Sequence, residues 1–581
     1  MTTSTAPSAP LGTTRRPGAL AWLGHRELQH YPATGARFFY LAVVILASIV
    51  LWYQYYVPTA VAPLLLRQFG LSFHNYVYII VGANLAGVVA ALFGGLTDRL
   101  GRTWVVIGGL LVVALIQLVA IPNTTSSAPF VVEIVTVGLF EGIILVATPA
   151  LVRDFTPQLG RASAMGFWTL GPVAGVLVAS LLGGHTISAT STDWQREFII
   201  SGVVGLVVFA AALGFLRELA PQIRDQVMVT DRDRALVELH ARGLDVEAAT
   251  AHPWRQMVKF DIIASAVAVS VMLLIFYTAS GFFTVYLSTV FHRNGTYFTL
   301  PQANGIDTWI WAVDCVSLIV FGLLSDAVRV RKPFMVVGAL GALVMMLLLI
   351  SHTGHPTSGY DTVVWVASGV FAFTAMAYAT WMASFTETVE ARNPALTATG
   401  LAIWGGILRL TVAVSLLIMP LVVSSASKVV DNQRYQQYVP KALAIEHRYG
   451  PLIAIVQRHQ HLFDQLATYP DPSKIPPALL AQAVAAAGGL KNLLAINAIK
   501  PDLAFLQKYQ SHLVALQQGA NASPAEWQHW FWVCFGGIAF FIPMVFVMKG
   551  RWSPSRARRD ERQHEELVAA EMQRLGMGSG R

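Results

Sequence analysis

Three ionisable side chains interrupt long apolar runs, and they carry most of the chemistry that this sequence offers. Glu141 lies within the stretch VGLFEGIIL, Asp314 lies within WIWAVDCVSL, and Arg409 follows Gly405 and Gly406. A charged side chain at the centre of a membrane-spanning helix costs roughly 2.5–3.5 kcal/mol on insertion scales, so such residues mark functional sites. Burial favours the neutral form of a carboxylic acid, which suits a proton carrier. We therefore expect Glu141 or Asp314 to carry a proton and Arg409 to bind an anionic group of a solute.

A structural role for the same residues is the alternative. Arg409 would then be held by Asp314 or Glu141 in a buried ion pair that fixes the packing of the helices. Asp307 shares a helix face with Asp314, because the two are seven positions apart. Asp307 and Glu133 lie nearer the outer ends of their apolar runs, where they can meet water.

The elements that must hold these residues are membrane-spanning helices. Of the 581 residues, 55% are hydrophobic and 12% are charged, and the mean hydropathy is +0.55. A soluble domain carries about 25% charged residues, so this composition indicates a polytopic membrane protein. Cys315 and Cys534 show no metal-site spacing, and no nucleophile–base or metal motif indicates an enzyme. The formal charge of +8 fits basic cytoplasmic loops, and nothing resembles a nucleic-acid-binding module.

Twelve segments are long and apolar enough to span a bilayer, which takes about 20 residues each. The first six are residues 38–65, 73–97, 103–122, 130–152, 161–184 and 197–217. The second six are residues 260–290, 303–324, 334–352, 362–386, 394–424 and 528–548. The first, seventh and eleventh spans are long, so we expect tilt or kinks there, with Pro58, Pro63 and Pro420 as candidate causes.

Basic residues concentrate in the loops on one side of these spans. That side carries Arg102, Arg153 and the linker 218–259, whereas the short loops of the other side hold at most one Lys or Arg each. By the positive-inside rule, the basic side is cytoplasmic. We expect both tails, 1–37 and 549–581, to be cytoplasmic, and the protein to lie in the plasma membrane.

A long polar segment, residues 425–527, separates the eleventh and twelfth spans. It is rich in Ala and Gln, and several of its stretches carry apolar residues at helical spacing. The topology places it outside the cell, where we expect a small helical cap or a loosely packed helical loop. His459 and His461 have no second ligand cluster with matching spacing, so we expect no metal site.

The strongest pattern is an internal repeat at the cytoplasmic end of the second span of each half. In GGLTDRLGR, Gly94 precedes Asp98 by four residues, and in GLLSDAVRVRK, Gly322 precedes Asp326 by four residues. Two six-helix halves around a linker are typical of transporters that bind their solute near the membrane midplane.

The first motif resembles the G-x-x-x-D-R-x-G-R loop signature of the major facilitator superfamily, and the resemblance covers nearly the whole chain. It implies an all-α integral membrane protein with twelve helices in two halves, 38–217 and 260–548, the second of which contains the insert. It also implies secondary transport by alternating access. The second copy departs from the signature, because it lacks a glycine matching Gly101 and an arginine matching Arg99.

The repeated loop is expected to act as a gate on the cytoplasmic side. Asp98 can accept hydrogen bonds from N–H groups at a helix start or pair with a basic residue, which closes that side while the site faces outward. Exposed pairs of this kind are worth about 0–1 kcal/mol, so they can break in every cycle. The alternative is that these charges only set the topology. The candidate gate residues are Gly94, Asp98, Arg99, Arg102, Arg153, Asp326 and Arg331.

In the superfamily that this chain resembles, helices 1, 4, 7 and 10 line the central path. Polar and aromatic residues on the first, seventh and tenth spans are therefore candidates for the cavity wall. Their alternative role is packing between helices or anchoring at the membrane interface. These candidates are Tyr53, Gln54, Tyr56, Tyr277, Tyr286, Tyr378 and Trp381.

The function that follows is secondary active transport of a small organic solute, coupled to protons or another ion and with an organic anion as the favoured solute. The stretch GPVAG, which contains Gly171 and Gly175, resembles part of an antiporter motif, so proton-driven efflux of drugs or metabolites stays open. Its other explanation is a proline kink with a small-residue packing face. A non-transporting receptor that binds a partner through the insert 425–527 is the alternative from another class. We expect no cofactor, and we expect a monomer whose partners are the solute, protons and the lipid bilayer.

Overall fold

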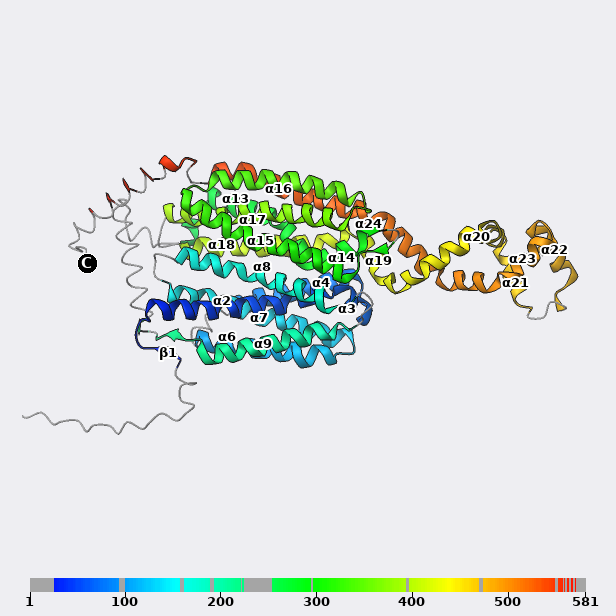
Figure 1. Ribbon diagram of the computed structural model, residues 1–581, viewed down its shortest axis with the longest axis horizontal. Coiled ribbons are helices and arrows are strands. Elements are labelled where there is room, and N and C mark those ends of the chain that lie inside the picture. Colours follow the sequence, from blue (N-terminus) through cyan, green and yellow to red (C-terminus); the bar gives the residue numbers. More distant parts are fainter. Residues whose placement is uncertain are drawn as a thin grey trace, which may run out of the picture.

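The structure is a computed structural model that describes residues 26–92, 100–156, 161–188, 193–220, 222–223, 253–293, 296–392, 397–469, 474–548 and parts of 552–570. Twelve of the described helices are long and apolar enough to cross a membrane, which confirms the predicted number of spans. Figure 1 shows them as one bundle of roughly parallel helices, from one end of which residues 425–527 project. We call this end the insert end. The opposite end, where β1 (Glu27–Leu28) lies, is the tail end.

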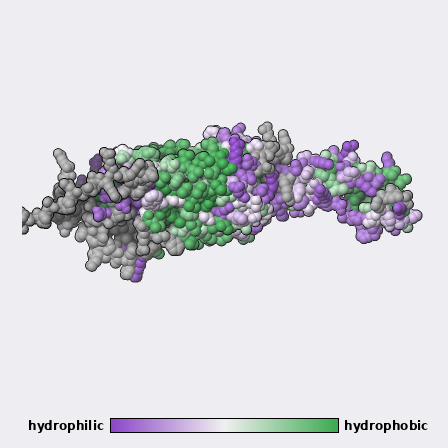
Figure 2. All heavy atoms as spheres, turned by 90° about the horizontal axis from the view of Figure 1, so that it is seen from below, coloured by the Kyte–Doolittle hydropathy of each residue, from purple (hydrophilic) through white to green (hydrophobic). Residues whose placement is uncertain are grey.

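On the face seen in Figure 2, apolar residues cover the middle of the bundle, whereas the surface around the base of the insert is mostly polar. A belt of apolar side chains with polar surface beyond it is the surface that a bilayer requires. Within the belt every backbone N–H and C=O group must bond inside the protein, which is why the apolar runs form helices.

The first six spans form one half of the bundle. α2 (Thr34–Ala60) continues after Val61 as α3 (Ala62–Phe69), and α4 (Phe73–Leu92), α6 (Arg102–Leu115), α7 (Ser127–Phe155), α8 (Arg161–Thr186) and α9 (Gln195–Phe215) follow. α6 runs on through a π turn, η1 (Ile116–Ala120), and a 3₁₀ turn, η2 (Ile121–Asn123). The parallel pairing of β1 with β2 (Glu218–Leu219) ties the chain before the first span to the chain after the sixth.

The second half repeats this arrangement. Before its last span, it comprises the short α12 (Pro253–Met257), α13 (Phe260–Met272) and α14 (Leu274–Val290), the hairpin of β3 (His292–Arg293) with β4 (Thr296–Tyr297), α15 (Leu300–Val328), α16 (Lys332–Thr353), α17 (Tyr360–Arg392) and α18 (Thr397–Val422). α15 begins with a capping box, in which Thr299 and Gln302 satisfy each other's backbone N–H groups.

Two of the three long spans contain a break. Pro58 lies within α2 and Pro63 lies in the first turn of α3, so the break at Val61 fits the missing N–H groups of these prolines. α13 and α14 are separated at Leu273, although neither helix contains a proline. Pro420 lies inside the continuous helix α18, near its end.

Small residues bring α4 and α7 into close contact. Gly138 and Gly142 on α7 face Ala83 and Gly87 on α4, and a Cβ atom at Gly142 would overlap the backbone of Gly87. Membrane helices commonly pack through small residues in this way, because their backbones can then approach closely. Glu141 lies beside these glycines, so the packing of α4 on α7 also fixes the base of its side chain.

The two halves meet through α8 against α15 and through α4 against α18. The hydrogen bonds that join described residues of the two halves lie toward the insert end. Thr284 Oγ1 donates to Thr59 O at 2.7 Å, and Asn304 Nδ2 donates to Ala60 O at 2.9 Å. The interface between the halves is therefore closed at the insert end.

The insert is helical, as expected, but it projects from the bundle as a stalk (Figure 1). Its helices are α19 (Ser425–Asn432), the 3₁₀ helix η4 (Gln433–Tyr438), α20 (Val439–Arg458), α21 (Gln460–Ala467), α22 (Pro477–Ala487), α23 (Leu490–Ala498) and the first part of α24 (Lys500–Val547). The twelfth span, expected at 528–548, is the last part of α24, a continuous helix of 48 residues. At the base of the stalk, Glu526 Oε2 accepts a hydrogen bond from Ser425 N at 2.7 Å.

Candidate functional site

Glu141 lies at mid-length of α7, with its Oε2 atom against Gly87 of α4 and with groups of both halves in electrostatic range. It is 7% exposed, and its Oε1 atom has no hydrogen-bond partner. Arg409 on α18 and Tyr277 on α14 are near enough to interact with it electrostatically. Both Glu141 and Arg409 are described, and no ion pair within 4.0 Å joins them. A carboxyl group and a guanidinium thus face one interface without neutralising each other by contact.

Arg409 is half-buried, and within the described part of the chain it has no hydrogen bond or ion pair. Neither Glu141 nor Asp314 holds it, so the contact pair of the structural alternative is not seen among these residues. Cβ atoms at Gly405 and Gly406 would meet nothing within 4 Å, which leaves open space one turn away. A guanidinium in this setting can bind a carboxylate or phosphate through two parallel hydrogen bonds.

Three tyrosines lie within electrostatic range of Glu141: Tyr55 and Tyr56 on α2 and Tyr277 on α14. The Tyr56 hydroxyl shares a hydrogen bond with Ser280, whereas the buried Tyr55 hydroxyl has no partner. An unsatisfied buried polar group costs about 1–3 kcal/mol, so a bound solute or water would complete the bonding of Tyr55. We call Glu141, Arg409 and these three tyrosines the central cluster. It combines one cation, one acid and several hydroxyl groups at the interface between the halves.

Two predicted cavity residues on α2 face other helices of the first half. Tyr53 is 1% exposed and lies in electrostatic range of Glu197 on α9. Gln54 Nε2 donates to Ser201 O, also on α9, at 3.3 Å. The contacts of both side chains are with α9, so they are those of helix packing.

The α2 residues in electrostatic range of Glu141 are Tyr55 and Tyr56, of which only Tyr56 was singled out from the sequence, and Trp52 lies beside them against Gly175 of α8. Trp52 stacks on Tyr56 with ring centroids 5.5 Å apart. The three residues follow the i, i+3, i+4 spacing of one helix face, so the signal was present in the stretch LWYQYY.

Predicted aromatics of the second half divide in the same way. The Tyr286 hydroxyl bonds to Thr353 Oγ1 at 2.7 Å, and Trp381 Nε1 donates to Ser265 Oγ at 2.8 Å. Both side chains are fully buried among helices of the second half. Tyr378 stacks on Trp381, with ring centroids 6.4 Å apart, and also lies in electrostatic range of Tyr277.

Asp314 on α15 does not contact Arg409. It is 4% exposed and interacts electrostatically with Tyr378, which in turn lies in electrostatic range of Tyr277. Asp307 lies two turns nearer the insert end. From its place near the outer end of an apolar run we expected that it can meet water, but its side chain is buried, with 5% exposed.

The first copy of the repeated loop is described only in part. Arg102 is buried, and its Nη1 atom pairs with Asp154 Oδ2 at 2.7 Å. Its backbone N–H donates to Glu218 Oε2 at 2.9 Å, which links the loop to β2. Four predicted gate positions lie outside the described residues or have side chains outside them: Gly94, Asp98, Arg99 and Arg153.

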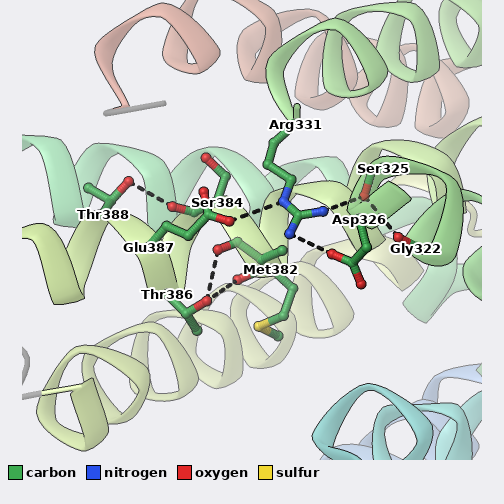
Figure 3. Close-up of polar contacts among 10 residues, drawn as sticks. Gly322, Ser325, Asp326, Arg331, Met382, Ser384, Thr386, Glu387 and Thr388 are labelled. Carbon is green, nitrogen blue, oxygen red and sulfur yellow. Dashed lines mark hydrogen bonds and ion pairs between the residues drawn. The ribbon is translucent and has the colours of Figure 1, made fainter. Parts of the chain in front are cut away.

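The second copy of the loop forms a polar cluster at the tail end, shown in Figure 3. Arg331 Nη2 pairs with Asp326 Oδ1 at 2.5 Å, and Arg331 Nε donates to Glu387 Oε1 at 3.2 Å. Arg331 Nη1 also donates to Ser325 Oγ at 2.7 Å. The two carboxylates are about half exposed, so each pair contributes little and can break. Glu387, on α17, was not singled out from the sequence.

The sequence profile of the Major Facilitator Superfamily matches residues 44–414. This chain belongs to the Major Facilitator Superfamily. The matched range runs from the first span into α18, so it includes the central cluster and both copies of the repeated loop.

Curated transporters match parts of this superfamily member. The hexuronate transporter of Escherichia coli (strain K12) is 27% identical over 204 residues, which are 34% of this chain and 45% of that protein. The quinolone resistance protein NorB of Staphylococcus aureus (strain JH9) is 26% identical over 165 residues, which are 28% of this chain and 35% of that protein. The chain thus spans less than half the length of these curated relatives.

Two solved structures share the superfamily fold. A bacterial homologue of the human lysosomal transporter Spinster, inward-facing and unoccupied, aligns with a TM-score of 0.54 at 17% identity, over 90% of this chain and 100% of that chain. A D-xylose–proton symporter aligns with a TM-score of 0.52 at 15% identity, over 67% of this chain and 90% of that chain. At these identities the likeness shows the fold.

The superfamily and the curated relatives that match this chain are transporters, not enzymes. In such transporters the two halves are related by an axis along the membrane normal, and the solute site lies near the midplane where the halves meet. Glu141 on α7 and Arg409 on α18 come from different halves and meet at this interface.

Proposed function

We propose that this chain is a proton-coupled symporter of a small organic anion in the plasma membrane. Arg409 carries the proposal, because it is a half-buried guanidinium that faces the interface of the two halves without a hydrogen bond or ion pair among the described residues. An anionic group of the solute supplies the missing acceptor. Similarity to a protein named as a hexuronate transporter supports an organic acid as the solute class.

Glu141 is the proposed proton carrier of this site. When it is ionised, its negative charge lies near Arg409 and opposes the approach of an anion. When it is protonated, Arg409 is left to the solute. Proton and anion then strengthen each other's binding, which is the thermodynamic requirement for symport. The hydroxyl groups of Tyr55 and Tyr277 lie beside Glu141 and can donate hydrogen bonds to the solute.

The orientation in the membrane is part of the proposal. The basic loops favour a cytoplasmic tail end and an external insert end. Hydrogen bonds that close the insert end then correspond to an inward-facing state. In a cysteine-free background, Ser511→Cys on the stalk should react with an impermeant maleimide added to whole cells, whereas Ser555→Cys should react only after lysis. The reverse labelling pattern would invert the orientation.

Efflux of drugs or metabolites is the competing function, and the similarity to NorB favours it. The GPVAG stretch supports it less, because Gly171 and Gly175 lie against Ser48 and Trp52 of α2, where larger side chains would clash. Close packing of α8 on α2 accounts for these glycines without a role in antiport.

The deciding experiment is counterflow of labelled carboxylates, hexuronates first, in proteoliposomes with an imposed pH gradient. Arg409→Ala should raise the half-saturating anion concentration by about 30-fold or more, the equivalent of roughly 2 kcal/mol. Arg458→Ala removes an exposed cation from the stalk and serves as the matched control. Equal counterflow by the Arg409→Ala variant and the wild type would exclude the anion site. Export of cationic drugs without carboxylate counterflow would favour efflux.

A further inference from the structure

A second buried polar cluster lies nearer the insert end than Glu141 and Arg409, and its wall includes Ser280, the partner of Tyr56. It surrounds a small cavity with room for about one water-sized particle. Residues of α2, α8, α14 and α15 line it, and none of the lining residues is Lys, Arg or His. The cavity therefore lies where both halves meet, in the closed part of their interface.

Two residues of α15 that line this cavity each carry an acceptor atom without a donor. Asn304 Nδ2 donates to Ala60 O at 2.9 Å and to Leu300 O at 3.1 Å, so these carbonyl groups fix the amide with Oδ1 on the other side. Asn304 Oδ1 and Asp307 Oδ1 are both buried and have no hydrogen-bond partner. The residues are 0% and 5% exposed, respectively, so bulk water does not satisfy them.

The break in the first span adds negative potential at the same place. α2 ends at Ala60, and Thr59 and Ala60 line the cavity together with Asp307. The last carbonyl groups of a helix carry the negative end of its dipole, which favours a cation. In other transporters, carbonyl groups at the ends of broken helices coordinate sodium ions or protons.

We propose that Asp307 and Asn304, with the end of α2, form a sodium site. All the candidate ligands are oxygen atoms: the Asp307 carboxylate, the Asn304 amide oxygen and hydroxyls such as that of Thr284. The Thr59 and Ala60 carbonyls accept hydrogen bonds from Thr284 and Asn304 and thereby orient these two ligands. Such hard ligands suit a hard cation, and a cation removes the cost of a buried carboxylate that has no positive partner. A proton would also neutralise Asp307, but it would not require a cavity of the size of a water molecule.

The site couples the cation to the closure of the insert end. The carbonyl groups that orient Asn304 and Thr284 belong to the first half, whereas the ligands themselves belong to the second half. The ligands are therefore held in place only while Thr59 and Ala60 lie against α14 and α15. A ligand that binds one state better shifts the equilibrium toward that state. Sodium therefore stabilises the arrangement closed at the insert end. This inference goes beyond the proposed proton–anion symport, and its test requires no solute.

The test measures the Tm of the full chain in detergent at constant ionic strength, with sodium chloride replaced stepwise by choline chloride or potassium chloride. The wild type should gain stability as sodium increases, and Asp307→Asn should weaken the apparent sodium affinity by about 30-fold or more. Asp361→Asn is the control, because Asp361 is an exposed carboxylate in the first turn of α17 and does not line the cavity. This variant should keep the sodium response.

Two further measurements keep the proposal open to refutation if Asp307→Asn does not fold. Saturable binding of ²²Na⁺ to the wild type, displaced by sodium but not by potassium, is expected. Spin labels at the exposed Arg67 and His355 positions should move closer when sodium is added. A wild type that shows no sodium-specific binding or stabilisation would overturn the site. Stabilisation by acid alone would assign Asp307 to a proton instead. Either result leaves the anion site at Arg409 untouched.

Discussion

Replacing Glu141 by Gln should uncouple solute movement from protons while it preserves the solute path. Gln has nearly the same shape as a protonated Glu but carries no titratable group. The variant therefore mimics the state in which, in our proposal, Arg409 is available to an anion. We expect exchange of solute across the membrane to persist and accumulation driven by a pH gradient to disappear.

The size of the effect follows from the separation of the two charges. Glu141 and Arg409 are more than 4.0 Å apart. At 4 Å, unit charges interact by about 1 kcal/mol in water and by about 4 kcal/mol at an effective dielectric constant of 20. An anion at Arg409 meets Glu141 over a similar distance, so ionised Glu141 weakens its binding by an amount between these limits. At neutral pH the variant should bind the anion at least about fivefold, and at most several hundredfold, more tightly than the wild type.

The assay compares the anion affinity of wild type and variant across pH in proteoliposomes. Wild-type affinity should rise as the pH falls, because protonation of Glu141 removes the repulsion, and the affinity of the variant should not depend on pH. Glu133→Gln is the matched control on the same helix. Glu133 lies outside the central cluster, where its Oε1 atom accepts a hydrogen bond from Thr124 Oγ1 at 2.7 Å. Proton-driven accumulation by the Glu141→Gln variant would refute the reasoning and leave Asp314 as the candidate carrier.

Five further substitutions, in three sets, separate packing from function. Gly142→Ala should destabilise the contact of α7 with α4 by about 1–3 kcal/mol and lower the Tm, whereas Gly108→Ala, where nothing lies within 4 Å, should not lower it. Tyr286→Phe should lower the Tm through loss of about 1 kcal/mol of hydrogen bonding without changing the KM, and Tyr55→Phe should change the KM without lowering the Tm. Arg331→Ala should cost at most about 1 kcal/mol of stability but slow counterflow, which stopped-flow or tracer rates can measure.

The twelve spans were predictable because a bilayer demands about 20 apolar residues for each crossing. The proximity of Glu141 and Arg409 was also within reach, because charges inside apolar runs are costly and tend to face one another or a cavity. Which face of α2 looks inward was harder to predict. Tyr53, Tyr55 and Tyr56 are close together in the sequence, and only the packing of α2 against other helices decides which of them meets Glu141.

Other features depend on contacts between distant parts of the chain. Glu387 joins Arg331 from 56 positions away, and Asn304 reaches Ala60 across 244 positions. No pattern in the sequence around these residues predicts either contact. The start of α24 at Lys500 was missed for another reason. The expected boundary at 528 marks where the sequence becomes apolar, whereas the helix continues through the Ala- and Gln-rich stretch before it, since those residues favour helix without requiring a membrane.

The unbroken course of α24 has a mechanical consequence. At 1.5 Å per residue, its 48 residues measure roughly 70 Å, of which only about 30 Å is needed to cross the hydrocarbon core. About 40 Å of the same rod therefore continues into the stalk. If the rod stays straight, each degree by which the second half tilts moves the far end of this extension by about 0.7 Å. A fluorescent label near the tip would thus convert small rotations within the membrane into displacements that can be followed in single molecules.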